Sequence, residues 1–208
     1  MLWLCIRLPA LVSEAHAAGE REALERLAAW AYQWSSLVTY RVGGGVDAPL
    51  LWLEFGASHT LFGGHAALLT RIEAGLKRLG YSHSCALAPS PSAAALLARA
   101  PAGTQRRVFT RAQLRTQLQS LPLSLREQPP QVVAALQAAG LRRGGAALAL
   151  AAAALARRFG PQCCQYLARL TGEAGDPQPA CRLPDRYRAR CEVDQDVHNT
   201  TVLLFPLR

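Results

Sequence analysis

The spacing of hydrophobic residues along the first hundred positions alternates between the periods of strands and helices. Residues 2–8 and 50–55 are almost continuously apolar, as in strands that are buried within a sheet. Residues 20–34 and 64–79 place their apolar side chains three or four positions apart, which predicts two amphipathic helices. The shorter expected elements are strands at 38–42 and 83–88 and a helix at 92–99.

These elements follow one another in the order βαββαβ, the split βαβ or ferredoxin-like arrangement. We therefore predict an α+β fold in which residues 1–100 form a four-stranded antiparallel sheet with two helices on one face. Residues 2–8 and 50–55 should be the two central strands and hydrogen-bonded neighbours. The residues expected on the buried face of the second helix are Leu68, Ile72, Leu76 and Leu79.

A glycine-bounded connection lies between two predicted helices in the second half of the chain. Residues 130–139 read as a helix, residues 140–145 are Gly-Leu-Arg-Arg-Gly-Gly, and a further helical stretch covers 146–150. This order is the helix-hairpin-helix pattern. Gly140 and Gly145 would let the backbone come close to a phosphate group. Free N–H groups at the start of the next helix would bind that phosphate, and Arg142 and Arg143 would add further contacts. The alternative is an ordinary αα-hairpin with glycine caps.

The net charge of +9 is distributed unevenly. Residues 1–100 carry 8 basic and 7 acidic side chains, residues 101–191 carry 14 and 4, and residues 192–208 carry 1 and 3. A concentration of positive charge in one half is expected of a phosphate-binding module, although a solvated basic surface gives the same count. The charge therefore favours nucleic acid as a ligand without establishing it.

Five further arginines are candidates for contact with a nucleic-acid backbone. Arg157 and Arg158 end a predicted helix at 151–159, which a second helix at 162–170 follows. Residues 172–184 contain three prolines and read as a linker. Beyond them, the alternation of Arg186, Arg188 and Arg190 predicts a strand at 186–197 with one basic face.

A sequence resemblance narrows this interpretation. Residues 50–64, read as LLWLEFG…LFGG, and residues 68–100, LLTRIEAGLKRLGYSHSCALAPSPSAAALLARA, resemble the palm of the Y-family DNA polymerases of the UmuC and DinB type. Within that superfamily they are most similar to the ImuB type of bacterial mutagenesis accessory protein. The resemblance implies a palm at 1–100, a helical thumb with the helix-hairpin-helix at 101–171, a linker at 172–184 and the start of a little-finger domain at 185–208.

The resemblance also indicates where metal ligands would stand in an active polymerase of this type. Two Mg²⁺ ions need carboxylates that converge from the first and third strands. The matching positions here are Cys5 and Arg7 on the first strand and Pro49 and Leu50 at the third, and Arg7 would repel a cation. Glu54 remains on the third strand, and Asp47 would be a single ligand even after a shift in register. We expect no catalytic residue, no metal and no cofactor.

The expected function is that of a non-catalytic DNA-binding accessory protein in translesion synthesis, SOS-induced mutagenesis and DNA repair. Only residues 9–19 separate the first strand from the first helix, so a fingers domain is expected to be missing, and the little finger to be truncated. The alternatives are an active Y-family polymerase and a non-functional truncated fragment. By resemblance, the partners are DNA, bound without sequence preference, a RecA-like mutagenesis factor and an error-prone C-family DNA polymerase.

The remaining features bear on location and on other chemistry. Residues 1–12 are apolar but too short to span a bilayer and are interrupted by Arg7, so a cytoplasmic protein is expected. The resemblance implies that this is the bacterial cytoplasm, at the nucleoid. The six cysteines form no Cys-x-x-Cys pair, which argues against zinc. Ser58-His59 and Ser82-His83 are sequence neighbours without the arrangement of a catalytic pair. His65, at the start of a predicted helix, is expected to face solvent.

Overall fold

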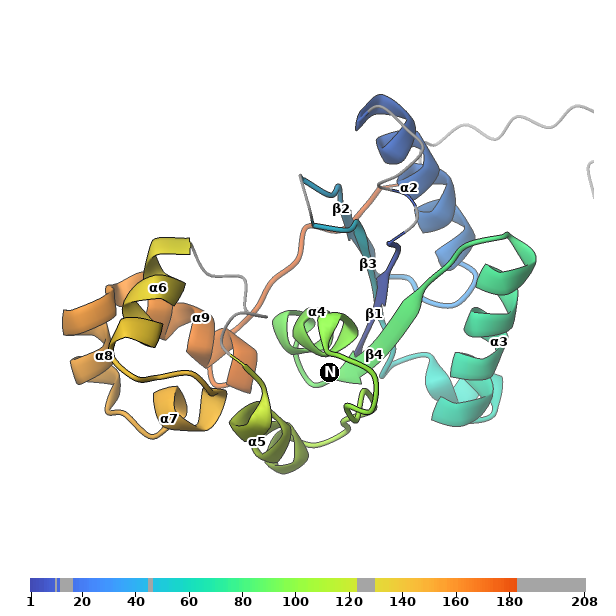
Figure 1. Cartoon of the computed structure of the whole chain (residues 1–208). Helices are drawn as coiled ribbons and strands as arrows, with labels where there is room; N and C mark the ends of the chain where they lie inside the picture. Colours follow the sequence, from blue (N-terminus) through green and yellow to red (C-terminus); the bar gives the residue numbers. More distant parts are fainter. Residues whose placement is uncertain (10, 12–16, 45–46, 123–129, 183–208) are drawn as a thin grey trace, which may run out of the picture.

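The computed structural model describes residues 1–9, 11, 17–44, 47–122 and 130–182 (Figure 1). In the first hundred residues its elements are β1 (Trp3–Arg7), α2 (Ala17–Ala31), β2 (Val38–Arg41), β3 (Leu50–Glu54), the 3-10 helix η1 (His59–Phe62), α3 (His65–Arg78), β4 (Ser84–Ala88) and α4 (Pro91–Arg99). The later elements are α5 (Arg111–Ser120), α6 (Pro130–Ala138), α7 (Gly144–Leu148), α8 (Ala152–Phe159) and α9 (Pro161–Thr171).

The four strands form one sheet in the order β2-β3-β1-β4, and every neighbouring pair is antiparallel. In the central pair, Trp3 lies opposite Glu54 and Arg7 lies opposite Leu50. On its other side, Arg7 lies opposite Ser84 of β4. The predicted βαββαβ order is therefore confirmed, and so is the prediction that the first and third strands are central neighbours.

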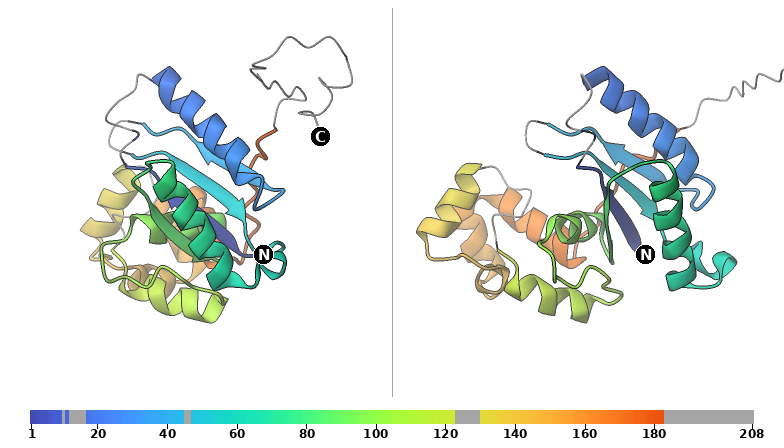
Figure 2. Two further views of the ribbon diagram at one scale, coloured as in Figure 1. Left: turned by 90° about the vertical axis from the view of Figure 1, so that its right-hand side faces the viewer. Right: turned by 45° about the vertical axis from the view of Figure 1, so that its right-hand side comes forward.

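Helices α2 and α3 lie side by side on one face of the sheet, as predicted (Figure 2). Because side chains alternate along a strand, every second residue of β1 and β3 points into this layer. The buried residues here include Leu4, Ile6, Leu51 and Leu53 from the strands and Leu24, Leu27, Leu68, Ile72 and Leu76 from the helices. Leu79 was expected among them and is instead 49% exposed, because α3 ends at Arg78 and Leu79 is its C-cap residue.

The opposite face of the sheet is covered by α4, which the sequence had placed in the chain but not on the sheet (Figure 1). The Ser90 hydroxyl accepts a hydrogen bond from the N–H of Ala93 and so caps this helix. Trp52 of β3 donates from its indole nitrogen to the carbonyl of Pro91 at 3.1 Å. Because both faces are covered, β1 and β3 are buried almost throughout.

The core on the α4 side continues into the helical part, which we define as α5 to α9. Helix α5 was not predicted individually; it begins with a capping box in which the Thr110 and Gln113 side chains each accept a hydrogen bond from the other residue's backbone. Leu114 of α5, Phe159 of α8 and Leu167 of α9 join the same buried cluster as Trp52. Sheet and helices are therefore joined through one hydrophobic core.

Residues 172–182, which we call the strap, return from α9 to the sheet without forming a helix or a strand. The Asp176 carboxylate accepts a hydrogen bond from the backbone N–H of Ser92 at 2.7 Å, in the first turn of α4. At its other end, the N–H of Cys181 donates to the carbonyl of Val38 at 2.7 Å, and Tyr32 donates from its hydroxyl to the carbonyl of Cys181. The stretch predicted as a linker is thus hydrogen-bonded to α4 near its start and to β2 of the sheet near Cys181.

Two predictions fall on residues that the structure does not describe. The expected start of a little-finger domain at 185–208, including the strand at 186–197, lies outside the described residues. The candidate residues Arg186, Arg188 and Arg190 lie there as well. Within the described part of the chain, no helix is both long and apolar enough to cross a membrane.

Candidate nucleic-acid interface

The positions that the resemblance matches to metal ligands include Arg7, Pro49 and Leu50, which lie together at one end of the sheet. Arg7 is flanked by Leu50 of β3 and by Ser84 of β4, and the N–H of Leu8 donates to the carbonyl of Pro49 at 3.1 Å. Arg7, Pro49 and Leu50 are therefore neighbours at this end of the sheet, and Arg7 is half-buried there.

Glu54 lies at the opposite end of β3, beside Trp3. Four residues along a strand separate its Cα from that of Leu50 by about 13 Å, too far to share a metal with that position. The carboxylate accepts hydrogen bonds from the N–H of Gly56 at 3.1 Å and from the N–H of Ala57 at 2.9 Å. Glu54 is buried, and its contacts are those of a residue that closes the turn after β3.

The other acidic residues at the Arg7 end of the sheet are also engaged in turns. Asp47 exchanges two backbone hydrogen bonds with Gly44, at 3.2 and 3.0 Å, and is exposed. Glu20 of α2 is buried and accepts a hydrogen bond from the N–H of Gly43; the sequence gave no signal for this contact. Among the described residues, no three His, Cys, Asp or Glu side chains lie close enough together to hold a metal ion.

The predicted hairpin connects α6 to α7 and exposes both of its arginines. Arg142 and Arg143 are exposed, and Arg143 forms an isolated antiparallel bridge with Pro122. The N–H of Gly144 donates to the carbonyl of Leu121 at 2.9 Å, so this first backbone donor of α7 already has a protein partner. The exposed side chains of Arg142 and Arg143 can therefore bind a phosphate, whereas the N–H of Gly144 is already hydrogen-bonded within the protein.

The two candidate glycines have different surroundings. Gly140 follows α6 with a φ of +79°, a conformation that suits glycine, and a Cβ there would meet open space. Gly145 lies within α7 and faces α5: a Cβ there would lie 3.3 Å from the carbonyl oxygen of Gln119 and 3.4 Å from its Cα. The absence of a side chain at Gly145 thus allows α7 to pack closely on α5.

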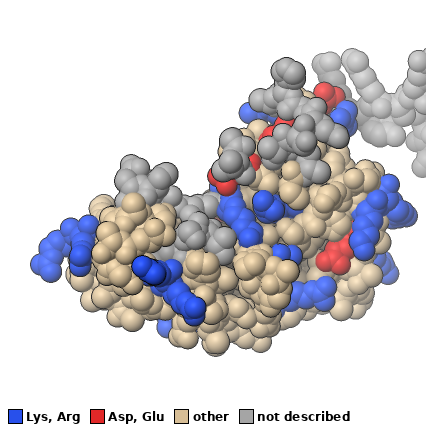
Figure 3. All heavy atoms as spheres, in the orientation of Figure 1, with Lys and Arg blue, Asp and Glu red and all other residues tan. Residues whose placement is uncertain are grey.

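Arg157 and Arg158 are exposed in the last turn of α8, where cations also interact favourably with the helix dipole. The Arg158 guanidinium lies 5.6 Å from the centre of the Phe159 ring. On the face shown in Figure 3, Lys and Arg side chains occur in separate groups over the helical part, with no acidic side chain between them. The structure therefore brings the four described candidate arginines to the surface of the helical part, without merging them into one cluster.

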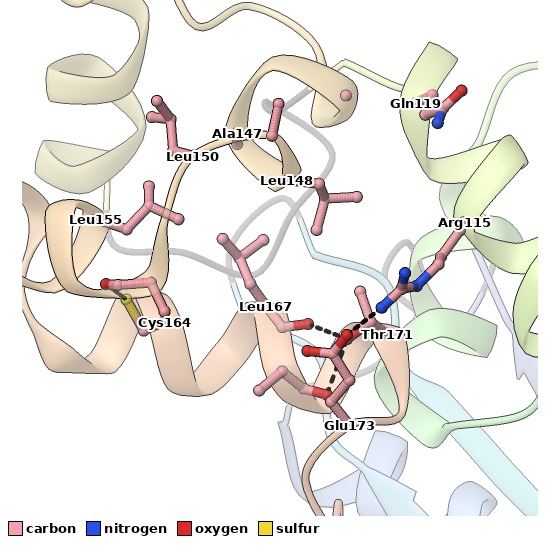
Figure 4. A pocket seen from close by; sticks show the side chains of 14 residues that line it. Arg115, Gln119, Ala147, Leu148, Leu150, Leu155, Cys164, Leu167, Thr171 and Glu173 are labelled. Atoms are coloured by element: carbon pink, nitrogen blue, oxygen red, sulfur yellow. Dashed lines mark hydrogen bonds and ion pairs between the residues drawn. The ribbon is translucent and has the colours of Figure 1, made fainter.

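The helical part also contains a hollow of about 320 Å³ between α5, α7, α8 and α9 (Figure 4). Its wall is largely apolar, with Leu148, Leu155 and Leu167 pointing inward. At its rim, the Arg115 guanidinium is paired with the Glu173 carboxylate. Because that pair neutralises the cation, the hollow does not have the charge expected of a phosphate site.

Solved structures that resemble this chain share one fold. DinB from Sulfolobus solfataricus matches with a TM-score of 0.60 at 10% identity, covering 86% of this chain and 70% of that chain. A DinB family error-prone DNA polymerase from the same organism gives a TM-score of 0.63 at 11% identity, covering 86% and 69%. A Dbh-based Y-family DNA polymerase chimera gives 0.60 at 11% identity, covering 91% and 71%. The antiparallel sheet and its helices thus define a protein with the fold of the Y-family DNA polymerases.

Sequence comparison shows which group of proteins with that fold the chain resembles. Protein ImuB from two strains of Caulobacter vibrioides, NA1000 / CB15N and ATCC 19089 / CB 15, is 32% identical to this chain over 177 residues, or 81% of the chain. The match spans 36% of the length of those relatives. No protein-family model matches the chain. The chain is an ImuB-like homologue of the Y-family DNA polymerases.

Proposed function

We propose that this chain is a non-catalytic, DNA-binding accessory protein of translesion synthesis that acts in DNA damage repair and SOS-induced mutagenesis. The observation that carries the proposal is the position of Arg7. It lies between Leu50 and Ser84, where a polymerase of this fold needs converging carboxylates, and it supplies a positive charge instead. Glu54, the carboxylate nearest in sequence on β3, is committed to the turn at the far end of that strand.

In this proposal the sheet part, residues 1–100, is the counterpart of a palm and the helical part is the counterpart of a thumb with a helix-hairpin-helix. DNA is held through its phosphates by the exposed side chains of Arg142, Arg143, Arg157 and Arg158, and so without sequence preference. Gly140 allows the sharp turn that presents the first two of these side chains. Arg186, Arg188 and Arg190 belong to the proposed interface as residues of a little-finger segment that follows the strap.

The similarity to ImuB supports partners as well as a ligand. We propose that the chain works with a RecA-like mutagenesis factor and an error-prone C-family DNA polymerase in the cytoplasm, at the nucleoid. An active Y-family polymerase is the second candidate, supported by the fold alone. A non-functional truncated fragment is the third, supported by the short connection between Arg7 and Ala17.

A primer-extension assay separates the first two candidates. The purified chain is incubated with a primed template and all four nucleotides in Mg²⁺ and, separately, in Mn²⁺. We expect no extension, because a cation stands where the metal ions of this reaction would bind. Template-dependent extension would contradict the proposal, and its loss in Asp47→Asn or Glu54→Gln would show which carboxylate serves a polymerase site.

Duplex binding tests the interface itself. Fluorescence anisotropy with labelled duplexes of unrelated sequence should give weak, uniform affinities that fall steeply with salt. The double variant Arg142→Ala/Arg143→Ala should weaken binding to all of them and flatten the salt slope by up to about two units. The matched control, Arg71→Ala/Arg78→Ala, removes two exposed arginines from α3 and should change the slope little. Absence of both extension and duplex binding would favour the non-functional fragment.

A further inference from the structure

A second basic surface lies outside the helical part, in a groove of about 820 Å³ beside the outer edge of β4. We call it the α3–β4 groove: its walls are the second half of α3, the start of β4 and residues 102–107, and Phe109 stands at one end. The lining residues that determine its charge and its aromatic surface are Glu73, Lys77, Cys85, Arg106, Arg107 and Phe109. The arginines of the helical part do not line it.

The backbone of residues 106–108 holds the second wall of this groove in place. The N–H of Leu87 donates to the carbonyl of Arg106 at 2.7 Å, and the N–H of Val108 donates to the carbonyl of Leu87 at 2.9 Å. These bonds add a short parallel bridge to the edge of β4. The side chain of Val108 is fully buried in the core on the α4 side, so strand alternation directs Arg107 toward the α3 side.

The charge of the groove is positive. Lys77 and Arg107 are exposed, and the half-buried Arg106 is anchored by a hydrogen bond from its guanidinium to the carbonyl of Ala100 at 2.7 Å. Among the described residues that line the groove, Glu73 is the one carboxylate. Burial first, and then the Glu73 carboxylate, raise the pKa of the Cys85 thiol, so this part of the wall stays neutral. Figure 3 shows basic side chains on both sides of an acidic one near α3 and β4.

The aromatic ring of Phe109 lines the α3–β4 groove together with these charged side chains. Phe109 is 44% exposed and also borders a neighbouring hollow of about 620 Å³, which Met1 and His65 help to line. Its ring centre lies 5.2 Å from that of His65, which in turn stacks on His59 at 3.9 Å. The ring is therefore supported from one side and open on the other. His65, which was expected to face solvent, is half-buried because of these stacked neighbours.

We propose that the α3–β4 groove binds single-stranded DNA, with phosphates along Lys77, Arg106 and Arg107 and one unpaired base stacked on Phe109. A cationic track beside an exposed aromatic ring is the combination that single strands use, since a base can stack on the ring only when it is unpaired. The inference rests on the proposed function only in taking DNA as the ligand. Its site is separate from the duplex interface assigned to the helical part.

The test is anisotropy of a short fluorescein-labelled oligothymidylate with the full chain. Lys77→Ala/Arg107→Ala should lower affinity about ten-fold at low salt and reduce the salt slope by roughly 1.4. Phe109→Ala should lower affinity about ten-fold with little change in slope, because stacking involves no counterion. Glu73→Gln should raise affinity, since it removes the opposing charge. The matched pair Arg71→Ala/Arg78→Ala, on the same helix outside the groove, should stay within about two-fold of the wild type.

Two results would overturn the proposal: groove variants with wild-type affinity, or a control pair that loses as much as the groove pair. Cross-linking of the unmodified chain gives a readout that does not depend on variants. Iodouracil-substituted oligonucleotide should cross-link to the peptide that contains Phe109, and cross-links confined to other peptides would contradict the site.

Measuring duplex binding and oligothymidylate binding on the same variants shows whether the groove proposal or the proposed duplex interface is wrong. Arg142→Ala/Arg143→Ala should weaken duplex binding and leave oligothymidylate binding unchanged. If that variant leaves duplex binding intact while the groove variants lose the single strand, the duplex interface is wrong and the groove stands. If it weakens both ligands equally while the groove variants weaken neither, single strands bind to the helical part and the groove is not a site.

Discussion

Replacing Glu54 by Ala should destabilise the protein by about 2–4 kcal/mol, because the residue is a structural one in this chain. Its carboxylate is buried at the end of β3 and accepts two backbone hydrogen bonds, from Gly56 and Ala57. Hydrogen bonds to a charged group contribute roughly 1.5–3 kcal/mol each, and an unsatisfied buried donor costs about 1–3 kcal/mol. Ala57 is exposed, so water recovers part of its loss and sets the lower end of the range.

Urea unfolding followed by circular dichroism measures this change, with the transition midpoint converted through an unchanged m-value. Glu54→Gln should lower the unfolding free energy by about half as much as Glu54→Ala. Its amide oxygen still accepts one hydrogen bond, but the negative charge is gone. Glu22→Ala is the control, because its exposed ion pair with Arg26, one helical turn away, contributes less than about 0.5 kcal/mol. A loss below about 0.5 kcal/mol in Glu54→Ala would refute the reasoning and reopen a catalytic role for this carboxylate.

Two further predictions concern acidity and helix packing. Burial first, and charge repulsion from His59 second, lower the pKa of His65, so the folded state resists protonation and stability should fall as the pH drops below about 6.5. The melting temperature should therefore fall less between about pH 7.5 and about pH 5.5 in His65→Gln than in the wild type, and equal falls would contradict this. Gly145→Val should lower the unfolding free energy by about 1–3 kcal/mol, because its side chain would press on Gln119 of α5. Weakened duplex binding by this variant without any loss of stability would instead favour backbone contact with a phosphate.

Much of the sheet part could be predicted because its hydrophobic pattern is strong. The nearly continuous apolar run at 50–55 predicted β3, and the helical spacing of Leu68, Ile72 and Leu76 predicted α3. The sequence indicated helices on one face, whereas a strand that is buried at every position needs cover on both faces. That second cover comes from α4 and the helical part, and it depends on contacts such as the one between Trp52 and Pro91, far apart in the chain.

The residue types of the candidate site could be read from the sequence, whereas their three-dimensional surroundings could not. The resemblance matched Arg7 and Leu50 to carboxylate positions of an active polymerase, and the sheet register shows that these two residues lie opposite each other. The surroundings of Gly145 were not visible, because α5 supplies them from residues more than twenty positions away. The α3–β4 groove was missed for the same reason, although Arg107 before the apolar Val108 was a usable signal for a short edge strand.

The burial of both sheet faces determines where a nucleic acid can reach this part of the molecule. With α2 and α3 on one face and α4 on the other, only the ends and edges of the sheet remain. Within the described part of the chain, the β2 edge is bonded to the strap at Val38 and the β4 edge is bonded to residues 106–108 at Leu87, so the Arg7 end is the remaining approach. A cluster of carboxylates at that end would repel phosphates unless metal ions filled it, whereas Arg7 attracts them without a metal. In the proposed function, the positive charge of Arg7 thus both opposes the metal ions of polymerisation and favours metal-independent binding of DNA.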